Sequence, residues 1–523
     1  MKKISAQQTK DILTHEAEIA FLDVREHGQY GEGHPFFSVN MPYSQIEMLA
    51  PRLVPSLGVK CVLLDDGDGV SERAAAALEG IGYRDVVVLT GGAPAWQAAG
   101  YTLFKGVNLP SKTFGELVEH KFDTKSISAE ELDAYIKNDY DYILLDGRSM
   151  PEFQKMTLPT SQSCPNAELG YRLPMLCKDP TTPIIINCAG RTRSIIGAQG
   201  LVLLDIPNPI YTLRNGTQGW RLAGFDLVHG ASPLPLPELD AETLEAGRAL
   251  AADLREKYGL QTITGEETKA WLADPERSTF LFDVRTEEEF AKGHVTGAQS
   301  APGGQLVQAT DEKLAVRNAR IILSCDNGLR SASTAIWLVG MGHQVYLLDT
   351  NTPMDAVTTG AAKKNISTID AEDLKKRIDA GAKVLDASKG LDYRAGHIDG
   401  AQWVTRARLD AGTMGDLDDL VIVGQSSALV KGIIAEFKAD TGQVPQDIFI
   451  GTTEQWRDAG LSVVETPESP SEMECIDHLF FVHDRHDGNL DAARRYLEWE
   501  TGLLDQLDDQ ERSIIEPLVA SQG

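Results

Sequence analysis

Two cysteines stand where an apolar stretch meets a loop that contains arginine. The stretch "PIIINCAGRTRSIIGAQGLVLL" (183–204) carries β-branched residues up to Asn187 and Cys188, and "RIILSCDNGLRSASTAIWLV" (320–339) repeats the arrangement around Cys325. A short β-branched run followed by an apolar pattern with helical spacing predicts a strand, a tight loop and a helix. Both cysteines are therefore expected at a corner between a strand and a helix.

Such a corner can activate a thiol. Successive backbone N–H groups of the loop can point at one spot near the positive end of the helix dipole. A cysteine there is expected to have its thiolate favoured over its thiol, which makes Cys188 a candidate nucleophile. Arg191 and Arg193 are permanent cations that can hold a small oxyanion. The alternative is a buried strand-end cysteine whose arginines pair with surface acids.

The second loop, "CDNGLR", differs beside its cysteine. Asn327 and Gly328 suit a tight turn and Arg330 supplies a cation, but Asp326 places a carboxylate next to Cys325. Since like charges repel, we expect Cys325 to react less readily with a dianion than Cys188 does. A purely structural cysteine remains the alternative at this position.

The corner belongs to a pattern that occurs four times, in segments called copies one to four. Each copy begins with a helix-capping signature, at Ser5 with Gln8, Ser128 with Glu131, Thr264 with Glu267 and, more weakly, Asp370 with Asp373. A strand then ends at Asp23, Asp146, Asp283 and Asp386, and a second strand ends 43, 42, 42 and 39 residues later at Asp66, Cys188, Cys325 and Gln425. We therefore expect Asp66 and Gln425 at the nucleophile position of copies one and four.

Further repeated elements support the same division. "GHVTGA" (293–298) and "GHIDGA" (396–401) match each other, and a glycine turn precedes a tryptophan at Trp96, Trp220 and Trp456, which we expect in the core. Strands that alternate with helical segments predict an α/β fold in which each copy is a mainly parallel sheet flanked by helices.

The expected domain boundaries follow from these copies. Copy one takes 1–107, copy two 108–232, a Pro-rich linker with a helix and copy three 233–360, copy four 361–466, and a helical tail 467–523. The tail also holds His478, His483 and His486, so a metal site is the alternative there. We favour a helix that docks on a domain or a partner, because apolar residues recur at helical spacing, and we assign no metal.

Composition narrows the classes of function. The chain has 523 residues and a net charge of −28, so several domains are expected and nucleic acid or an anionic membrane is disfavoured as a partner. The start, "MKKISAQQTKDIL", lacks the apolar stretch of a signal peptide, and we expect a cytoplasmic protein. Six scattered cysteines without a CxxC pair indicate neither a disulfide framework nor a zinc site.

Taken in order, the strand aspartates, the "GHxxGA" element, the cysteine corner and the tryptophan turn resemble the rhodanese superfamily over about 450 residues. The resemblance implies a loop cysteine that carries a persulfide. Six-residue loops (188–193 and 325–330) are similar to those of the sulfurtransferase members, whereas related phosphatases have one residue more. It also implies that copies one and four are non-catalytic, and that Asp146 with Arg148 and Asp283 with Arg285 are structural ion pairs.

The resulting hypothesis is a sulfurtransferase without cofactor that moves sulfur from thiosulfate or an organic persulfide to cyanide, glutathione or a protein thiol. Cys188 is the expected nucleophile and Cys325 a second catalytic candidate, and the two could relay sulfur. The expected substrate-binding residues are those of the two loops, Ala189, Gly190, Arg191, Thr192, Arg193, Ser194, Asp326, Asn327, Gly328, Leu329 and Arg330. A non-catalytic sulfur carrier or interaction scaffold is the alternative, and a phosphatase or arsenate reductase is a third possibility.

Overall fold

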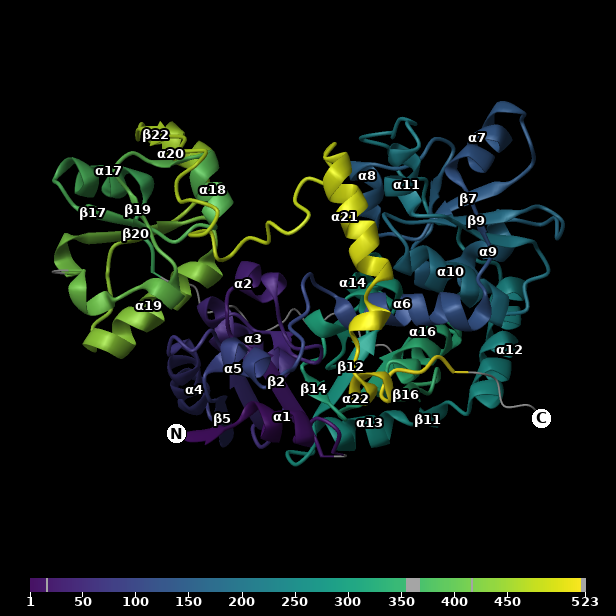
Figure 1. The fold of residues 1–523 in the computed structure, drawn as a ribbon, viewed down its shortest axis with the longest axis horizontal. Coiled ribbons are helices and arrows are strands. Elements are labelled where there is room, and N and C mark those ends of the chain that lie inside the picture. Colours follow the sequence, from purple (N-terminus) through teal and green to yellow (C-terminus); the bar gives the residue numbers. More distant parts are fainter. Residues whose placement is uncertain (16, 354–366, 415–416, 519–523) are drawn as a thin grey trace. The chain divides into compact units, whose positions relative to one another are not determined.

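The computed structural model describes residues 1–15, 17–353, 367–414 and 417–518 (Figure 1). The chain divides into two compact units, with one boundary between Val107 and Asn108 and another between Phe481 and Val482. The first unit contains copies one and four. The second contains copies two and three together with the C-terminal segment from Val482 onwards, so the tail splits between the two units.

Copy two shows the architecture that the other copies repeat. Its strands are β6 (Ser126–Ile127), β7 (Ile143–Asp146), β8 (Gln162–Ser163), β9 (Ile184–Asn187) and β10 (Ile210–Leu213). They pair in the order β6-β10-β9-β7-β8, and every pair is parallel. The β-branched run that ends before Cys188 is thus a central strand, which suits its continuous apolar sequence.

Copies one and three have the same strand order. The strands of copy one are β1 (Lys2–Ile4), β2 (Ile19–Asp23), β3 (Val39–Asn40), β4 (Lys60–Leu64) and β5 (Asp85–Leu89). Those of copy three are β11 (Gln261–Ile263), β12 (Thr279–Asp283), β13 (Gln299–Ser300), β15 (Arg320–Ser324) and β16 (Gln344–Leu348). In both, the first strand pairs with the last and the second strand with the third, as in copy two. A further short strand, β14 (Val316–Arg317), precedes β15.

Copy four keeps the centre of this sheet. Its strands pair in the order β19-β17-β20-β21, and a separate antiparallel pair joins β18 to β22. The bounds are β17 (Lys383–Asp386), β18 (His397–Ile398), β19 (Gln402–Trp403), β20 (Leu420–Gly424), β21 (Ile448–Ile450) and β22 (Val463–Val464). Where the other copies have a first edge strand, Ile369 donates a single backbone hydrogen bond of 2.9 Å to the carbonyl of Ile448.

Helices connect the strands within each copy. Copy one has α1 (Ala6–Ile12), α2 (His27–Glu32), α3 (Ile46–Leu53), α4 (Val70–Gly80) and α5 (Gly92–Ala98), and copy two has α7 (Ala129–Lys137), α8 (Met150–Lys155), α9 (Asn166–Leu176), α10 (Thr192–Leu203) and α11 (Gly216–Leu222). Copy three has α13 (Gly265–Leu272), α14 (Glu287–Lys292), α15 (Gly303–Gln308) and α16 (Leu329–Gly340), and copy four has α17 (Ala371–Asp379), α18 (Gly390–Ala395), α19 (Ser427–Thr441) and α20 (Thr453–Asp458). Helix α6 (Leu109–Phe122) precedes the first strand of copy two, α12 (Ala241–Tyr258) precedes the first strand of copy three, and α21 (Leu490–Thr501) and α22 (Asp509–Arg512) lie in the C-terminal tail.

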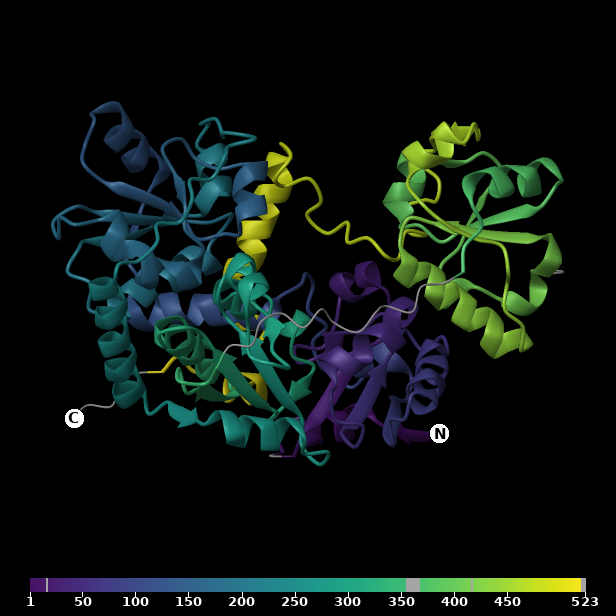
Figure 2. The ribbon, with the colours of Figure 1, turned by 180° about the vertical axis from the view of Figure 1, so that it is seen from behind.

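The sheet of copy two separates two apolar layers. Ile184 and Ile186 contribute to a cluster with α9 and α10, whereas Ile185 and Trp220 belong to a cluster on the opposite face with α7. This alternation is the period of two expected of a strand. Opposite views show helices along both faces of this sheet (Figures 1 and 2). The cores therefore hold the carboxyl ends of the central strands in place. None of the described helices is both long and apolar enough to cross a membrane.

Candidate active site

Strand register identifies the corner residue of each copy. The strand aspartates Asp23, Asp146, Asp283 and Asp386 pair with Leu64, Asn187, Ser324 and Val423. The residues that follow are Asp65, Cys188, Cys325 and Gly424. The prediction of Asp66 and Gln425 at the nucleophile position was therefore wrong by one residue in copies one and four. It relied on distances along the sequence through loops of variable length, and the pairing register of the strands cannot be read from such distances. In the first three copies the corner lies 42 residues after the aspartate, a regularity that could have corrected copy one.

Neither of these corrected positions carries a thiol. The Asp65 side chain accepts hydrogen bonds of 2.9 Å from the backbone N–H groups of Gly67 and Ser71 and is thereby held inside the loop. Asp66 instead pairs with Arg25 at 2.8 Å. Gly424 has no side chain at all. That copies one and four are non-catalytic remains a prediction, now based on these two residues.

Cys188 lies at the start of the loop between β9 and α10. Its side chain is buried, and its thiol donates a 3.5 Å hydrogen bond to Ser194 Oγ. Its carbonyl accepts a hydrogen bond of 2.9 Å from the backbone N–H of Thr217. Gly216 allows this approach: its φ is +55°, and a Cβ there would lie 2.2 Å from the Cys188 carbonyl oxygen. The turn before Trp220 therefore packs closely against the backbone of the Cys188 loop.

Arg193 is the cation that acts on Cys188. Burial raises the pKa of the Cys188 thiol, and the charge of Arg193 opposes that rise without overcoming it. Arg193 also forms two hydrogen bonds of 2.7 Å to Glu152, the capping-box residue of α8. Burial disfavours the charge on Glu152, but these bonds outweigh it and lower its pKa to about 2. Burial therefore acts against the thiolate that was expected at Cys188, and Arg193 acts in favour of it.

Arg191 points away from the thiol toward α6. Its guanidinium binds Glu116 at 2.7 and 2.8 Å and also Glu119. Burial raises the pKa of Glu116 to about 7, although Arg191 counteracts this effect. Arg191 is therefore already neutralised by two carboxylates and holds the loop against α6.

The Cys325 loop has the same length but a different charge environment. The Cys325 thiol is buried, donates to Ser331 Oγ at 3.3 Å and accepts from the backbone N–H of Gly328 at 3.2 Å. Arg330 is fully buried and binds three carboxylates, those of Glu168 (2.8 Å), Glu289 (2.7 Å) and Asp326 (2.9 Å). Burial raises the pKa of the Cys325 thiol, Arg330 counteracts that rise, and Asp326 adds to it.

A helix covers this second loop. A Cβ on Gly247 of α12 would lie 2.5 Å from Asn327 Nδ2, and one on Gly328 would lie 3.2 Å from the Cβ of Ala251. Asn327 Oδ1 accepts from the backbone N–H of Leu329, which is itself buried. The side chains of the Cys325 loop are thus held between α12 and the sheet.

Comparisons with known proteins agree with this repeated architecture. The sequence model of the family described as "Rhodanese-like domain" matches residues 5–99, 128–223 and 264–351. The chain belongs to this family. A crystal structure of thiosulfate sulfurtransferase from Pseudomonas aeruginosa is 36% identical, with a TM-score of 0.89 and 100% of both chains covered. The uncharacterized protein YqhL of Bacillus subtilis (strain 168) is 36% identical over 77 residues, which are 14% of this chain and 56% of that protein. The chain thus spans little more than half the length of this curated relative.

The strand-end aspartates of copies two and three form buried ion pairs. Asp146 binds Arg148 at 2.7 Å, and Asp283 binds Arg285 at 2.6 Å. Asn187 Nδ2 donates to Asp146 at 3.2 Å and so connects this pair to the residue before Cys188. Both ion pairs lie at the ends of strands. None of the hydrogen bonds described above for these residues joins them to a cysteine thiol.

The C-terminal tail covers the Cys188 loop. Glu500 of α21 accepts a hydrogen bond of 2.7 Å from the hydroxyl of Thr192. A Cβ on Gly190 would lie 3.1 Å from Glu500 Oε2 and 3.2 Å from Tyr496 Cε1. Sequence analysis did not identify Glu500, Tyr496 or Glu116, because nothing in their local sequence connects them to a distant loop. Glu152 could have been found, since Ser149-x-x-Glu152 is a capping box like the others.

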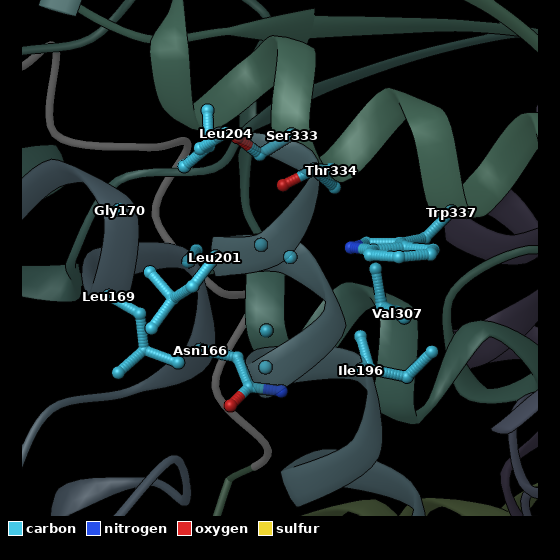
Figure 3. Close-up of a pocket in the computed structure, with 15 residues that line it drawn as sticks. Asn166, Leu169, Gly170, Ile196, Leu201, Leu204, Val307, Ser333, Thr334 and Trp337 are labelled. Atoms are coloured by element: carbon cyan, nitrogen blue, oxygen red, sulfur yellow. The ribbon is translucent and has the colours of Figure 1, made fainter. Parts of the chain in front are cut away.

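A small cavity lies between copies two and three but belongs to neither loop. Its volume is about 40 Å³, which is more than one water molecule needs. Figure 3 shows Ile196 of copy two facing Val307 and Trp337 of copy three across it. Asn166, which lines this cavity, donates a hydrogen bond of 2.8 Å to the backbone carbonyl of Arg193 and so stabilises the end of the Cys188 loop. No residue of either cysteine loop, 188–193 or 325–330, lines this cavity. Among the described residues no group of histidine, cysteine and carboxylate side chains is arranged to hold a metal.

Proposed function

We propose that this chain is a sulfurtransferase that carries sulfur as a persulfide on Cys188. The observation that carries the proposal is Cys188 at the base of a six-residue loop, one turn before α10, with the charge of Arg193 acting on its thiolate. A thiolate so placed is a nucleophile suited to covalent catalysis. The full-length similarity to a thiosulfate sulfurtransferase supports the same assignment.

The proposed reaction has two half-steps. The Cys188 thiolate attacks the outer sulfur of thiosulfate or of an organic persulfide, the S–S bond of the donor breaks, and sulfite or a thiolate leaves with the electron pair. An acceptor such as cyanide, glutathione or a protein thiol then attacks the outer sulfur of the Cys188 persulfide and releases the thiolate. The backbone N–H groups of the loop stabilise the anionic sulfur in both half-steps.

The roles within the two loops are proposed to differ. Arg193 stabilises the Cys188 thiolate and persulfide, and the backbone of Ala189, Gly190, Thr192 and Ser194 surrounds the sulfur. Arg191 is a positioning residue, because its charge is already bound to α6. Cys325 is a secondary candidate, since the only loop cation beside it, Arg330, is shared among three carboxylates.

Intact-mass analysis with peptide mapping tests this proposal. The wild type, Cys188→Ser and Cys325→Ser are treated with thiosulfate or an organic persulfide, and the mass gain is measured. We expect one added sulfur atom in the wild type and in Cys325→Ser, and none in Cys188→Ser. A sulfur atom that requires Cys325 would make copy three the catalytic copy. No gain with either donor would favour the scaffold hypothesis.

A further inference from the structure

The C-terminal helix α21 brings a carboxylate into the Cys188 site. Asn489 caps this helix by accepting from the N–H of Ala492 at 3.0 Å. Its buried side is formed by Ala492, Ala493, Tyr496, Leu497 and Glu500. Four of these are apolar or aromatic, as expected for a docked face, but the last is an acid. Burial of an acid is costly, so its presence on this face requires an explanation.

Glu500 has one oxygen bound and one oxygen unsatisfied. Its side chain is 1% exposed, and Oε1 accepts the hydrogen bond of 2.7 Å from Thr192. Oε2 is buried and has no hydrogen-bond partner among the residues the structure describes. This oxygen faces Gly190, where an added Cβ would lie only 3.1 Å away. A buried carboxyl oxygen in this position calls for a group that donates a hydrogen bond to it.

A second acceptor belongs to a side chain that also borders Gly190. Gln218 of α11 is buried and uses its Nε2 to donate to the carbonyl of Ala189 at 3.2 Å. Its Oε1 is likewise buried without a partner among the described residues. A Cβ on Gly190 would lie 3.4 Å from Gln218 Nε2, so this amide borders the same loop residue as Glu500. Two acceptors without donors therefore flank the backbone of the loop.

The charges around the loop do not favour a dianion. Arg193 is bound to Glu152, and Arg191 is bound to Glu116 and Glu119. Glu500 adds a further carboxylate that touches the loop itself. The nearby Lys112 ammonium is buried against the rings of Tyr496 and Trp499, at 5.5 and 4.8 Å from the ring centres. The charges of these cations are thus already offset by carboxylates, with Glu500 acting on both Lys112 and Arg191.

We propose that Glu500 is a specificity-determining residue of the Cys188 site, which selects sulfur donors that present an ammonium or other N–H group over dianionic donors. The inference rests on the proposed function and names the donor class as the persulfide of an aminothiol. Its N–H group binds Glu500 Oε2 and Gln218 Oε1 while its outer sulfur faces Cys188. The Cys188 thiolate attacks this sulfur, the S–S bond of the donor breaks, and the aminothiol leaves as its thiolate.

The test measures kcat/KM for three donors, namely the persulfide of cysteamine, the persulfide of 3-mercaptopropionate and thiosulfate. In the wild type we expect the cationic persulfide to exceed the anionic persulfide, which is similar in size, by about tenfold. A preference for the anionic persulfide in the wild type would overturn the inference without any variant.

Glu500→Gln is the decisive variant, because it keeps the size of the side chain and an oxygen that can accept from Thr192. We expect the ratio of cysteamine persulfide to thiosulfate to fall about tenfold, through a loss for the first donor and a gain for the second. Glu498→Gln, an exposed position on the same helix, is the matched control and should leave the ratio unchanged. If the two variants have equal thermal unfolding midpoints, a difference between their donor ratios reflects donor selection and not a loss of folded protein.

Failure of the inference can be separated from failure of the proposed function. If the wild type forms a Cys188 persulfide but Glu500→Gln has the wild-type donor ratio, only the inference is wrong. If no donor places sulfur on Cys188 in the wild type, the proposed function fails and the inference fails with it.

Discussion

The Cys188 and Cys325 loops have the same length and the same strand-to-helix setting, yet their neighbours differ. Arg193 binds one carboxylate, Glu152, whose side chain is 39% exposed. Arg330 is fully buried and binds three carboxylates. A guanidinium shared among three acids contributes less positive potential to a thiolate than one that has a single, partly solvated partner. Loop length alone therefore does not determine which cysteine reacts.

The two loops are also covered by different parts of the chain. Helix α12, which precedes copy three, packs on the Cys325 loop through Gly247 and Ala251. Helix α21 reaches the Cys188 loop from the end of the chain and brings Tyr496 and Glu500. The α12 residues that pack on the Cys325 loop are small and apolar, whereas α21 places polar groups beside the Cys188 loop. This difference supports the proposal that Cys188 carries the sulfur and that the Cys325 loop has a structural role.

The largest expected effect comes from removing each thiol. Cys188→Ser should lower kcat/KM for sulfur transfer by at least about a thousandfold, because a serine hydroxyl cannot carry the persulfide. Cys325→Ser should stay within about twofold of the wild type. Steady-state formation of thiocyanate from a sulfur donor and cyanide measures both. Similar losses in the two variants would contradict the division of roles.

Removing each arginine should separate stability from activity. Arg330→Leu is expected to lower the free energy of unfolding by about 3–5 kcal/mol, because Glu168 and Glu289 lose a fully buried partner and keep only Arg172. Arg193→Leu should cost about 1 kcal/mol, since Glu152 can be solvated, but should lower kcat strongly.

Urea unfolding of the two arginine variants, together with turnover, checks this expectation. Equal losses of stability would mean that the two arginines have equivalent surroundings.

Removing part of the contact between helix α21 and the Cys188 loop should change the reactivity of Cys188 alone. Tyr496→Ala removes the ring beside Gly190, and we expect alkylation of Cys188 by iodoacetamide to accelerate about tenfold, while Cys325 beneath α12 keeps its rate. Peptide mapping after timed alkylation measures each site separately. Arg494→Ala, on the exposed side of α21, serves as the control. A parallel acceleration at Cys325 would indicate general loosening.

The smallest expected effect is on the pH dependence of stability. Burial raises the pKa of the Cys188 thiol in the folded chain, so the unfolded chain loses this proton first as pH rises. The stabilisation is complete below the unfolded pKa of about 8.5 and is lost above it, by about 1.4 kcal/mol per pH unit.

The free energy of unfolding of the wild type relative to Cys188→Ser should therefore fall between pH 8 and pH 9.5. The other buried cysteines contribute equally to both proteins. A difference that does not change with pH would contradict the raised pKa.

Local patterns predicted much of the fold. The capping boxes at Ser5, Ser128 and Thr264 form as expected, and each opens a helix of its copy. The corner of copies two and three was placed correctly because a cysteine marks it. In copies one and four, where no cysteine marks it, the count ended one residue late, at Asp66 and Gln425. Only the pairing of neighbouring strands, Asp23 with Leu64 and Asp386 with Val423, identifies the position.

The sequence by itself determined the repeated sheets and the two cysteine corners, because strands, caps and tight loops depend on residues close together in the chain. Only the tertiary structure decided what surrounds each thiol. Thr192 and Glu500 are 308 residues apart, and Arg330 and Glu168 are 162 apart. Such contacts depend on how whole helices pack, which no local pattern records. The local sequence therefore predicts the strand-to-helix corner, whereas the charges that surround each thiol depend on tertiary packing.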